Sequence, residues 1–104
     1  MFATVRRYEG IDSNNIDELT KKVGESLAPK LSKLAGFISY FLIDTGNGVM
    51  SSIGLFETSM QANESTRVAS EWVRDEKLEN ILQNPPKVTD GEVIVHKTMN
   101  GIKA

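Results

Sequence analysis

The sequence contains no cysteine, which excludes disulfides, thiolate nucleophiles and cysteine metal sites. It has a single histidine, His96, and no grouping of His, Asp and Glu at ligand spacing, so no metal site is predicted. No apolar stretch approaches the ~20 residues of a membrane span. The segment Met1–Arg7 places charge after a short apolar run, the reverse of a signal peptide. These features predict a cytoplasmic protein.

An excess of basic charge is also lacking. Twelve Lys and Arg against fourteen Asp and Glu give a formal charge of −2, which argues against a nucleic-acid partner. The length of 104 residues, with 39% hydrophobic residues, suits one domain that builds its core without disulfides or metal. We therefore expect a single domain over residues 1–104, with about 100–104 as a loose tail.

The hydrophobic pattern predicts an α+β protein. β-Formers with period two, or continuous apolar runs, indicate strands, and apolar residues three and four apart indicate helices. The expected strands are 2–8, 37–44, 49–57 and 92–99, and the expected helices are 16–34 and 58–82. The order β-α-β-β-α-β is that of a ferredoxin-like fold with an antiparallel sheet.

Several residues predict where these elements begin, bend and turn. Asn15, with Glu18 three positions later, resembles a capping box, as does Thr58 with Gln61. Pro29 lacks an N–H group and should kink or split the first helix near Glu25. Residues 45–48, Thr-Gly-Asn-Gly, tolerate positive φ and predict a tight hairpin between the two middle strands.

The middle strands are apolar on both faces. Because side chains alternate along a strand, Phe37, Phe41 and Ile43 should lie on one face of the second strand. Ile38, Tyr40 and Leu42 should then lie on the other face. In this fold both helices cover one face of the sheet, so a second apolar face requires another cover. We expect two copies to stack their sheets as a homodimer.

Four segments resemble a known family: Gly36–Tyr40 at the entry to the second strand, Leu55–Glu57 at the end of the third, Glu71–Val73 in the second helix, and the hairpin Leu42–Val49. Together with the element order, which covers nearly the whole chain, they resemble the dimeric α/β-barrel superfamily. The resemblance is to small antibiotic-biosynthesis-monooxygenase-like domains, in particular a subgroup of short, mostly uncharacterised bacterial members.

The resemblance implies a homodimer in which the sheets form a barrel, with a ligand pocket between the sheet and helices of each subunit. Members include cofactor-independent monooxygenases acting on polyketide-like phenols, haem-degrading enzymes and proteins of unknown role. The haem-degrading branch places an Asn, a His and a Trp around the porphyrin. Here Thr4 and Arg6 stand where the Asn is expected, and His96 is in the last strand instead of the second helix.

Three residues are candidates for catalysis. His96 is the natural acid–base group because its ordinary pKa lies near neutrality, although a place at a dimer rim is the alternative. The hydroxyl of Tyr40 could hydrogen-bond a phenolic or carbonyl ligand, or anchor a core edge. Arg6 and Arg7 point to opposite faces, so one is covered; a covered arginine binds an anion or pairs with Glu57 or Glu92.

The expected pocket is partly aromatic and partly polar. Its candidate lining residues are Tyr8, Ser39, Ser52, Trp72 and Phe41.

Two functions fit these features. The first is a small cofactor-independent monooxygenase-like protein that binds a hydrophobic or aromatic small molecule, with a base, an anion-stabilising arginine and exclusion of water. The second is a non-catalytic ligand-binding or stress-response dimer that uses the same pocket.

Overall fold

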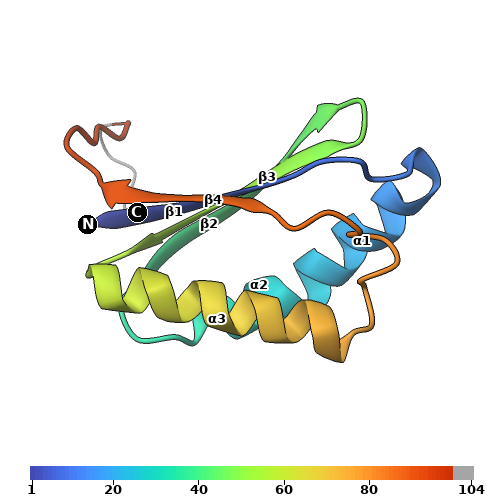
Figure 1. The fold of residues 1–104 in the computed structure, drawn as a ribbon. Coiled ribbons are helices and arrows are strands. Elements are labelled where there is room, and N and C mark those ends of the chain that lie inside the picture. The colour runs from blue at the N-terminus through green and yellow to red at the C-terminus, as the bar shows by residue number, and fades with distance from the viewer. Residues whose placement is uncertain (100–104) are drawn as a thin grey trace.

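A computed structural model describes residues 1–99 of the chain. The fold is a four-stranded antiparallel sheet with helices along one face (Figure 1). The strands are β1 (Phe2–Tyr8), β2 (Phe37–Gly46), β3 (Val49–Phe56) and β4 (Lys87–Glu92), and they lie in the order β2-β3-β1-β4. This is the predicted α+β, ferredoxin-like arrangement. The expected tail at 100–104 lies outside the described residues.

The first helical segment is interrupted where Pro29 predicts an interruption. A short 3-10 turn (Ser13–Asn15) leads into α1 (Ile16–Lys22), a π-helical turn (Val23–Leu27) and α2 (Ala28–Ser32). The π turn is closed by the Ala28 N–H donating to the Val23 carbonyl, just before the proline that has no N–H to donate. The split near Glu25 is therefore confirmed.

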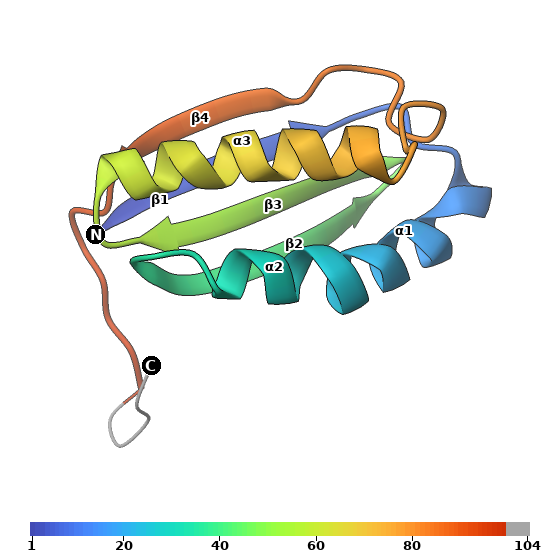
Figure 2. The ribbon, with the colours of Figure 1, turned by 90° about the horizontal axis from the view of Figure 1, so that it is seen from below.

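The expected cap at Asn15 is wrong, because this side chain makes no cap hydrogen bond. Asp12 accepts from the Asn14 N–H instead and starts the 3-10 turn. The second capping box is confirmed: Thr58 accepts from the Gln61 N–H, and Gln61 accepts from the Thr58 N–H. It opens α3 (Ser59–Asp75), which crosses the sheet beside α1 and α2 (Figure 2).

α3 ends at Asp75, seven residues before the predicted end at Leu82. Lys77 adopts a left-handed φ of 57°, which breaks the helical path. Leu78 then turns back into the core, so the apolar residues after the helix pack without being helical. No helix among residues 1–99 has both the length and the apolar character needed to cross a bilayer.

The last strand was misplaced by the sequence pattern. β4 is Lys87–Glu92, whereas 92–99 was expected. β4 is an edge strand, exposed at all six positions, and its backbone pairs with β1 from Arg7↔Lys87 to Phe2↔Glu92. The last backbone hydrogen bond between the two segments is donated by the Val93 N–H to the carbonyl of Met1, the residue before β1. The apolar residues that follow β4 are consequently outside the sheet.

A β-bulge in β2 changes one predicted face. Register moves from Phe37↔Phe56 to Ser39↔Leu55, so Phe37 shares the helix-covered face with Phe56 instead of lying with Phe41. The two rings meet edge to face at a centroid distance of 5.8 Å. Ile38 is the extra residue of the bulge.

The opposite face of the sheet carries an apolar row. Val5, Ile53 and Phe41 lie directly opposite one another across β1, β3 and β2. Phe41 is 50% exposed and Ile43, on the same face of β2, is 41% exposed. The predicted second apolar face is therefore present in the monomer.

Candidate functional site

A small cavity lies between the sheet and the helices. Its volume is about 30 Å³, which is enough for about two water molecules. Its polar lining comes from three strands: Arg6 and Tyr8 on β1, Tyr40 on β2 and Ser52 on β3. The rest of its wall is apolar: Ile11, Leu19, Val23, Leu27, Leu42, Met50, Trp72, Val73 and Leu82.

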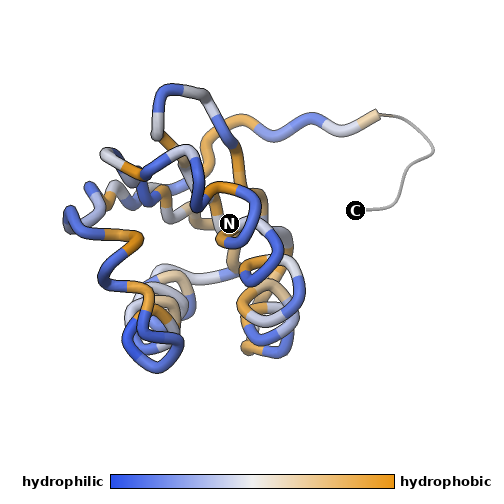
Figure 3. The backbone as a smooth tube through the Cα atoms, turned by 90° about the vertical axis from the view of Figure 1, so that its right-hand side faces the viewer, coloured by the Kyte–Doolittle hydropathy of each residue, from blue (hydrophilic) through white to orange (hydrophobic). Residues whose placement is uncertain are grey.

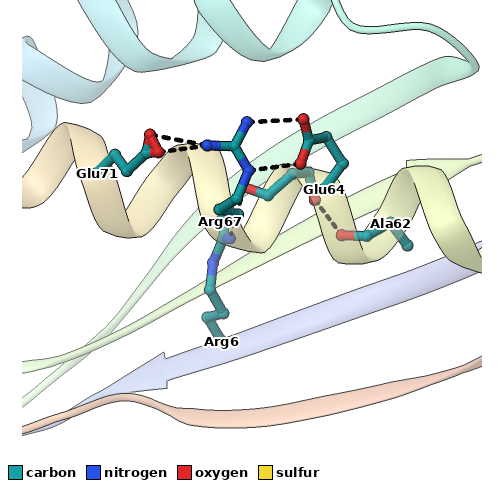
Figure 4. Close-up of polar contacts among 6 residues, drawn as sticks. Arg6, Ala62, Glu64, Arg67 and Glu71 are labelled. Carbon is teal, nitrogen blue, oxygen red and sulfur yellow. Dashed lines mark hydrogen bonds and ion pairs between the residues drawn. The ribbon is translucent and has the colours of Figure 1, made fainter.

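Arg6 is buried in this site, with 2% of its surface exposed. Its Nε donates to Ser52 Oγ at 3.3 Å and its Nη1 to the Ser65 carbonyl of α3 at 3.4 Å. Figure 4 shows the side chain rising from β1 towards α3. No ion pair with Glu57, Glu92 or another acid is formed by Arg6 within the described ranges. Of the two alternatives for a covered arginine, the internal salt bridge is not the one observed.

The two tyrosines of the chain, Tyr8 and Tyr40, both border the cavity. Burial raises the pKa of each phenol, and the positive charge of Arg6 opposes the rise in both. Their hydroxyls therefore stay protonated at neutral pH, where they can donate hydrogen bonds but are poor bases. Together with Arg6 they form a cluster of donors.

Because the chain has two tyrosines and both are in the site, base titration reports on the site alone. We expect phenolate absorbance of the folded protein to appear above the ordinary midpoint near pH 10, and that of the denatured protein near pH 10. The raised folded-state pKa values stabilise the fold below pH ~10, and this contribution is lost as pH rises through them. Tyr40→Phe should remove half of the absorbance change. A native midpoint at or below that of the denatured chain would contradict the half-buried, neutral phenols.

Trp72 forms part of the cavity wall and is held in place from α3. It is 3% exposed, and its indole N–H donates to Ser26 Oγ at 2.9 Å in the π-helical turn. The bond joins the two helical segments over the sheet. The interruption that Pro29 introduces thus positions a side chain that fixes the cavity wall.

An open groove lies outside the cavity, between α1, the π turn and β2. Its volume is about 240 Å³, and it shares Val23, Tyr40 and Leu42 with the cavity. Its other lining residues are Thr20, Gly24 and Ala28. A Cβ placed on Gly24 would meet nothing within 4 Å, so the groove is open at this turn of helix. These three shared side chains therefore border both the groove and the cavity that Arg6 lines.

The structure brings together five of the eight residues expected in the site: Arg6, Tyr8, Tyr40, Ser52 and Trp72. Ser39 and Phe41 belong elsewhere, because they pair with Leu55 and Ile53 on the opposite face of the sheet. Adjacent strand residues point to opposite faces, so neither can share a pocket with Tyr40. This corrects their expected place in the pocket.

His96 is also away from the cavity. It is exposed, on the segment that follows β4 and leaves the body of the domain (Figure 3). The backbone hydrogen bonds to the first strand end at Met1, so the segment after Val93 lies beyond the sheet. Its expected place in the last strand is therefore corrected, and within this chain it does not meet Arg6 or Tyr40.

The residues that the sequence did not identify as site residues are apolar. Leu19, Val23 and Leu27 recur four residues apart, a spacing that indicated a buried helix face but not a cavity wall. Met50, like Ser52, points to the helices from β3. The carbonyl of Ser65 carries no sequence signal, because any residue at that position presents one.

No family model matches the chain, and no curated protein matches it. Solved structures do. A monooxygenase from Streptomyces coelicolor (gene ActVA-Orf6), solved with nanaomycin D, is 16% identical, with a TM-score of 0.72 over 95% of this chain and 92% of that one. A variant of MhuD solved with two manganese protoporphyrin IX molecules per active site is 14% identical, with a TM-score of 0.73 over 95% and 100%.

A dimeric ferredoxin-like protein from an uncultured marine organism has a TM-score of 0.68 and 15% identity, over 94% of this chain and 98% of that one. Structures named as antibiotic biosynthesis monooxygenases match as well, so the chain has the ferredoxin-like fold of these structures, as the sequence resemblance predicted. At these identities the similarity shows only the fold, and the function has to be inferred from the residues of the site.

Proposed function

We propose that the chain binds a hydrophobic or aromatic small molecule between the sheet and the helices. The observation that carries this proposal is a buried guanidinium in a mostly apolar cavity that two half-buried phenols also line. Apolar walls with a few convergent polar groups are typical of small-molecule sites. The monooxygenase solved with nanaomycin D is a precedent for a small-molecule ligand bound to this fold.

The reaction proposed for this site is oxidation of the bound molecule by dioxygen without an organic cofactor. An anthrone illustrates the balance: its ring CH2 becomes a carbonyl with one oxygen atom, and the second oxygen atom leaves as water with the two hydrogens. The reacting form is the carbanion. Arg6 would stabilise that anion, Tyr8 and Tyr40 would donate hydrogen bonds to its oxygen, and the apolar wall would exclude water.

A non-catalytic binding protein is the second candidate, and one observation favours it. Within residues 1–99, no carboxylate or imidazole lines the cavity, so the base that removes the substrate proton is missing there. Neutral tyrosines with raised pKa values do not replace it. Catalysis then requires a substrate acidic enough to ionise beside Arg6, whereas simple binding requires no base.

Dioxygen uptake with 1,8-dihydroxyanthrone separates the two candidates. An oxygenase should exceed the uncatalysed rate, and Arg6→Met should remove most of the excess. His96→Ala decides the role first expected for that residue. A base contributes on the order of 10²–10⁴ in rate, so unchanged turnover removes His96 from the mechanism. Uptake at the uncatalysed rate, with the ligand bound, would leave the binding protein as the function.

We further propose that two copies stack through the apolar sheet face defined by Val5, Ile53 and Phe41. Half-exposed aromatic and aliphatic side chains in register give a surface whose burial is favourable at ~25 cal/mol per Å². The dimeric ferredoxin-like structure supports this assembly.

A further inference from the structure

The positive charge of Arg6 is only partly satisfied by the chain. A guanidinium has five N–H donors, and the two hydrogen bonds of Arg6 go to neutral oxygens of Ser52 and Ser65. The hydroxyl of Tyr40 is a further hydrogen-bond contact of the guanidinium, and it too is neutral. Within residues 1–99, the hydrogen-bond partners of Arg6 are therefore all neutral, and its side chain lines the cavity.

Nearby acids are engaged elsewhere. On α3, Glu64 and Glu71 both bind Arg67 on the exposed side of the helix, and their ion pairs point away from Arg6 (Figure 4). On the continuation of β1, Glu9 binds Arg7 at 2.7 Å. A buried cation is normally paired, because desolvation of an unpaired charge is unfavourable. The structure thus offers Arg6 a cavity where a carboxylate partner would be expected.

We infer that the ligand is an amphipathic organic acid whose carboxylate binds Arg6. This inference rests on the proposed binding function and specifies its ligand class. A guanidinium matches the two oxygens of a carboxylate, and the phenols of Tyr8 and Tyr40 supply donors for the remaining lone pairs. A neutral ligand would leave the buried charge without compensation.

The dimensions agree with a small head and a larger body. The cavity beside Arg6 has room for about two waters, which is the space that the two oxygens of a carboxylate need. The apolar body lies in the outer groove, past Val23 and Leu42, where Gly24 leaves the helix surface open. A ligand that occupies both spaces requires the side chains shared by them, Val23, Tyr40 and Leu42, to move apart.

The test compares 3-phenylpropanoate with 3-phenylpropanamide, which share shape and differ in charge. Binding is followed by the fluorescence of Trp72, which is the single tryptophan and lines the cavity. A hydrogen-bonded charge pair should favour the acid about 10–100-fold in the wild type. Arg6→Met should bring the affinity for the acid down to that for the amide. Gly24→Leu, which fills the groove, should weaken both probes alike.

The outcomes separate this inference from the function beneath it. Equal affinity of the wild type for acid and amide, with both weakened by Gly24→Leu, overturns the acidic ligand and keeps the pocket. Absence of binding by either probe to folded wild type overturns the pocket as well. If Arg6→Met does not fold, Arg6→Lys replaces it: a point charge without the planar fork should retain only part of the preference. An undiminished preference in Arg6→Lys and Arg6→Gln overturns the inference.

Discussion

Replacing Phe56 by alanine is expected to lower the free energy of unfolding by about 3–5 kcal/mol. Phe56 has no exposed surface, and its ring packs edge to face against Phe37, 5.8 Å away between centroids. Removing it leaves a cavity under the helices, which neighbours fill only in part because the strands are held by their ladder. Urea denaturation measures the loss as a shift in midpoint.

Phe41→Ala is the matched control, because it removes the same side chain from the other face of the sheet. Phe41 is 50% exposed, so a monomer should lose less than half as much stability as in Phe56→Ala. In the proposed dimer its effect is on assembly: Phe41→Glu should elute as a monomer, and the midpoint should no longer depend on protein concentration. Equal losses for both alanine variants at a concentration where the wild type is monomeric would contradict the two-face assignment.

Much of the fold could be predicted because local chemistry determines it. The Thr-Gly-Asn-Gly turn places Asn47 and Gly48 at positive φ, and Pro29 accounts for the π turn before it. β4 could not be predicted in this way. It is polar and exposed, and it forms because its backbone meets the free edge of β1, a contact between residues about 85 positions apart.

The site residues that the sequence predicted correctly are the polar and aromatic side chains of β1, β2, β3 and α3 that line the cavity. Arg6 and Tyr8 are two positions apart on β1, so their side chains point to the same face of the sheet. If one of them is covered by the helices, the other is expected on the covered face as well. On β2, the same alternation puts Ser39 and Phe41 on the face opposite Tyr40, so predicting all three in one pocket was inconsistent. The position of His96 depended on the end of a strand, which sequence patterns locate poorly. The groove beside Gly24 arises from the packing of two segments and has no local signal.

Arg6→Met should raise the free energy of unfolding by about 1–3 kcal/mol, opposite in sign to most buried substitutions. The buried guanidinium makes two long hydrogen bonds to neutral oxygens, whereas methionine fills a similar length with an apolar chain. A residue that destabilises the fold is retained when function requires it, and here the ligand acid would supply the missing charge. Thermal and urea unfolding of the ligand-free protein measure the change.

Thr4→Val provides the matched control for that increase. Thr4 is on the same strand and face as Arg6, is 1% exposed, and shares one hydrogen bond of 3.3 Å with Thr66. Its replacement should lower stability by about 1 kcal/mol, the ordinary result of losing a buried hydrogen bond. If Arg6→Met instead lowers stability by several kcal/mol, the guanidinium is a structural tie between β1 and α3. The cavity beside it would then need no acid, and the case for an acidic ligand would rest on the binding ratio alone.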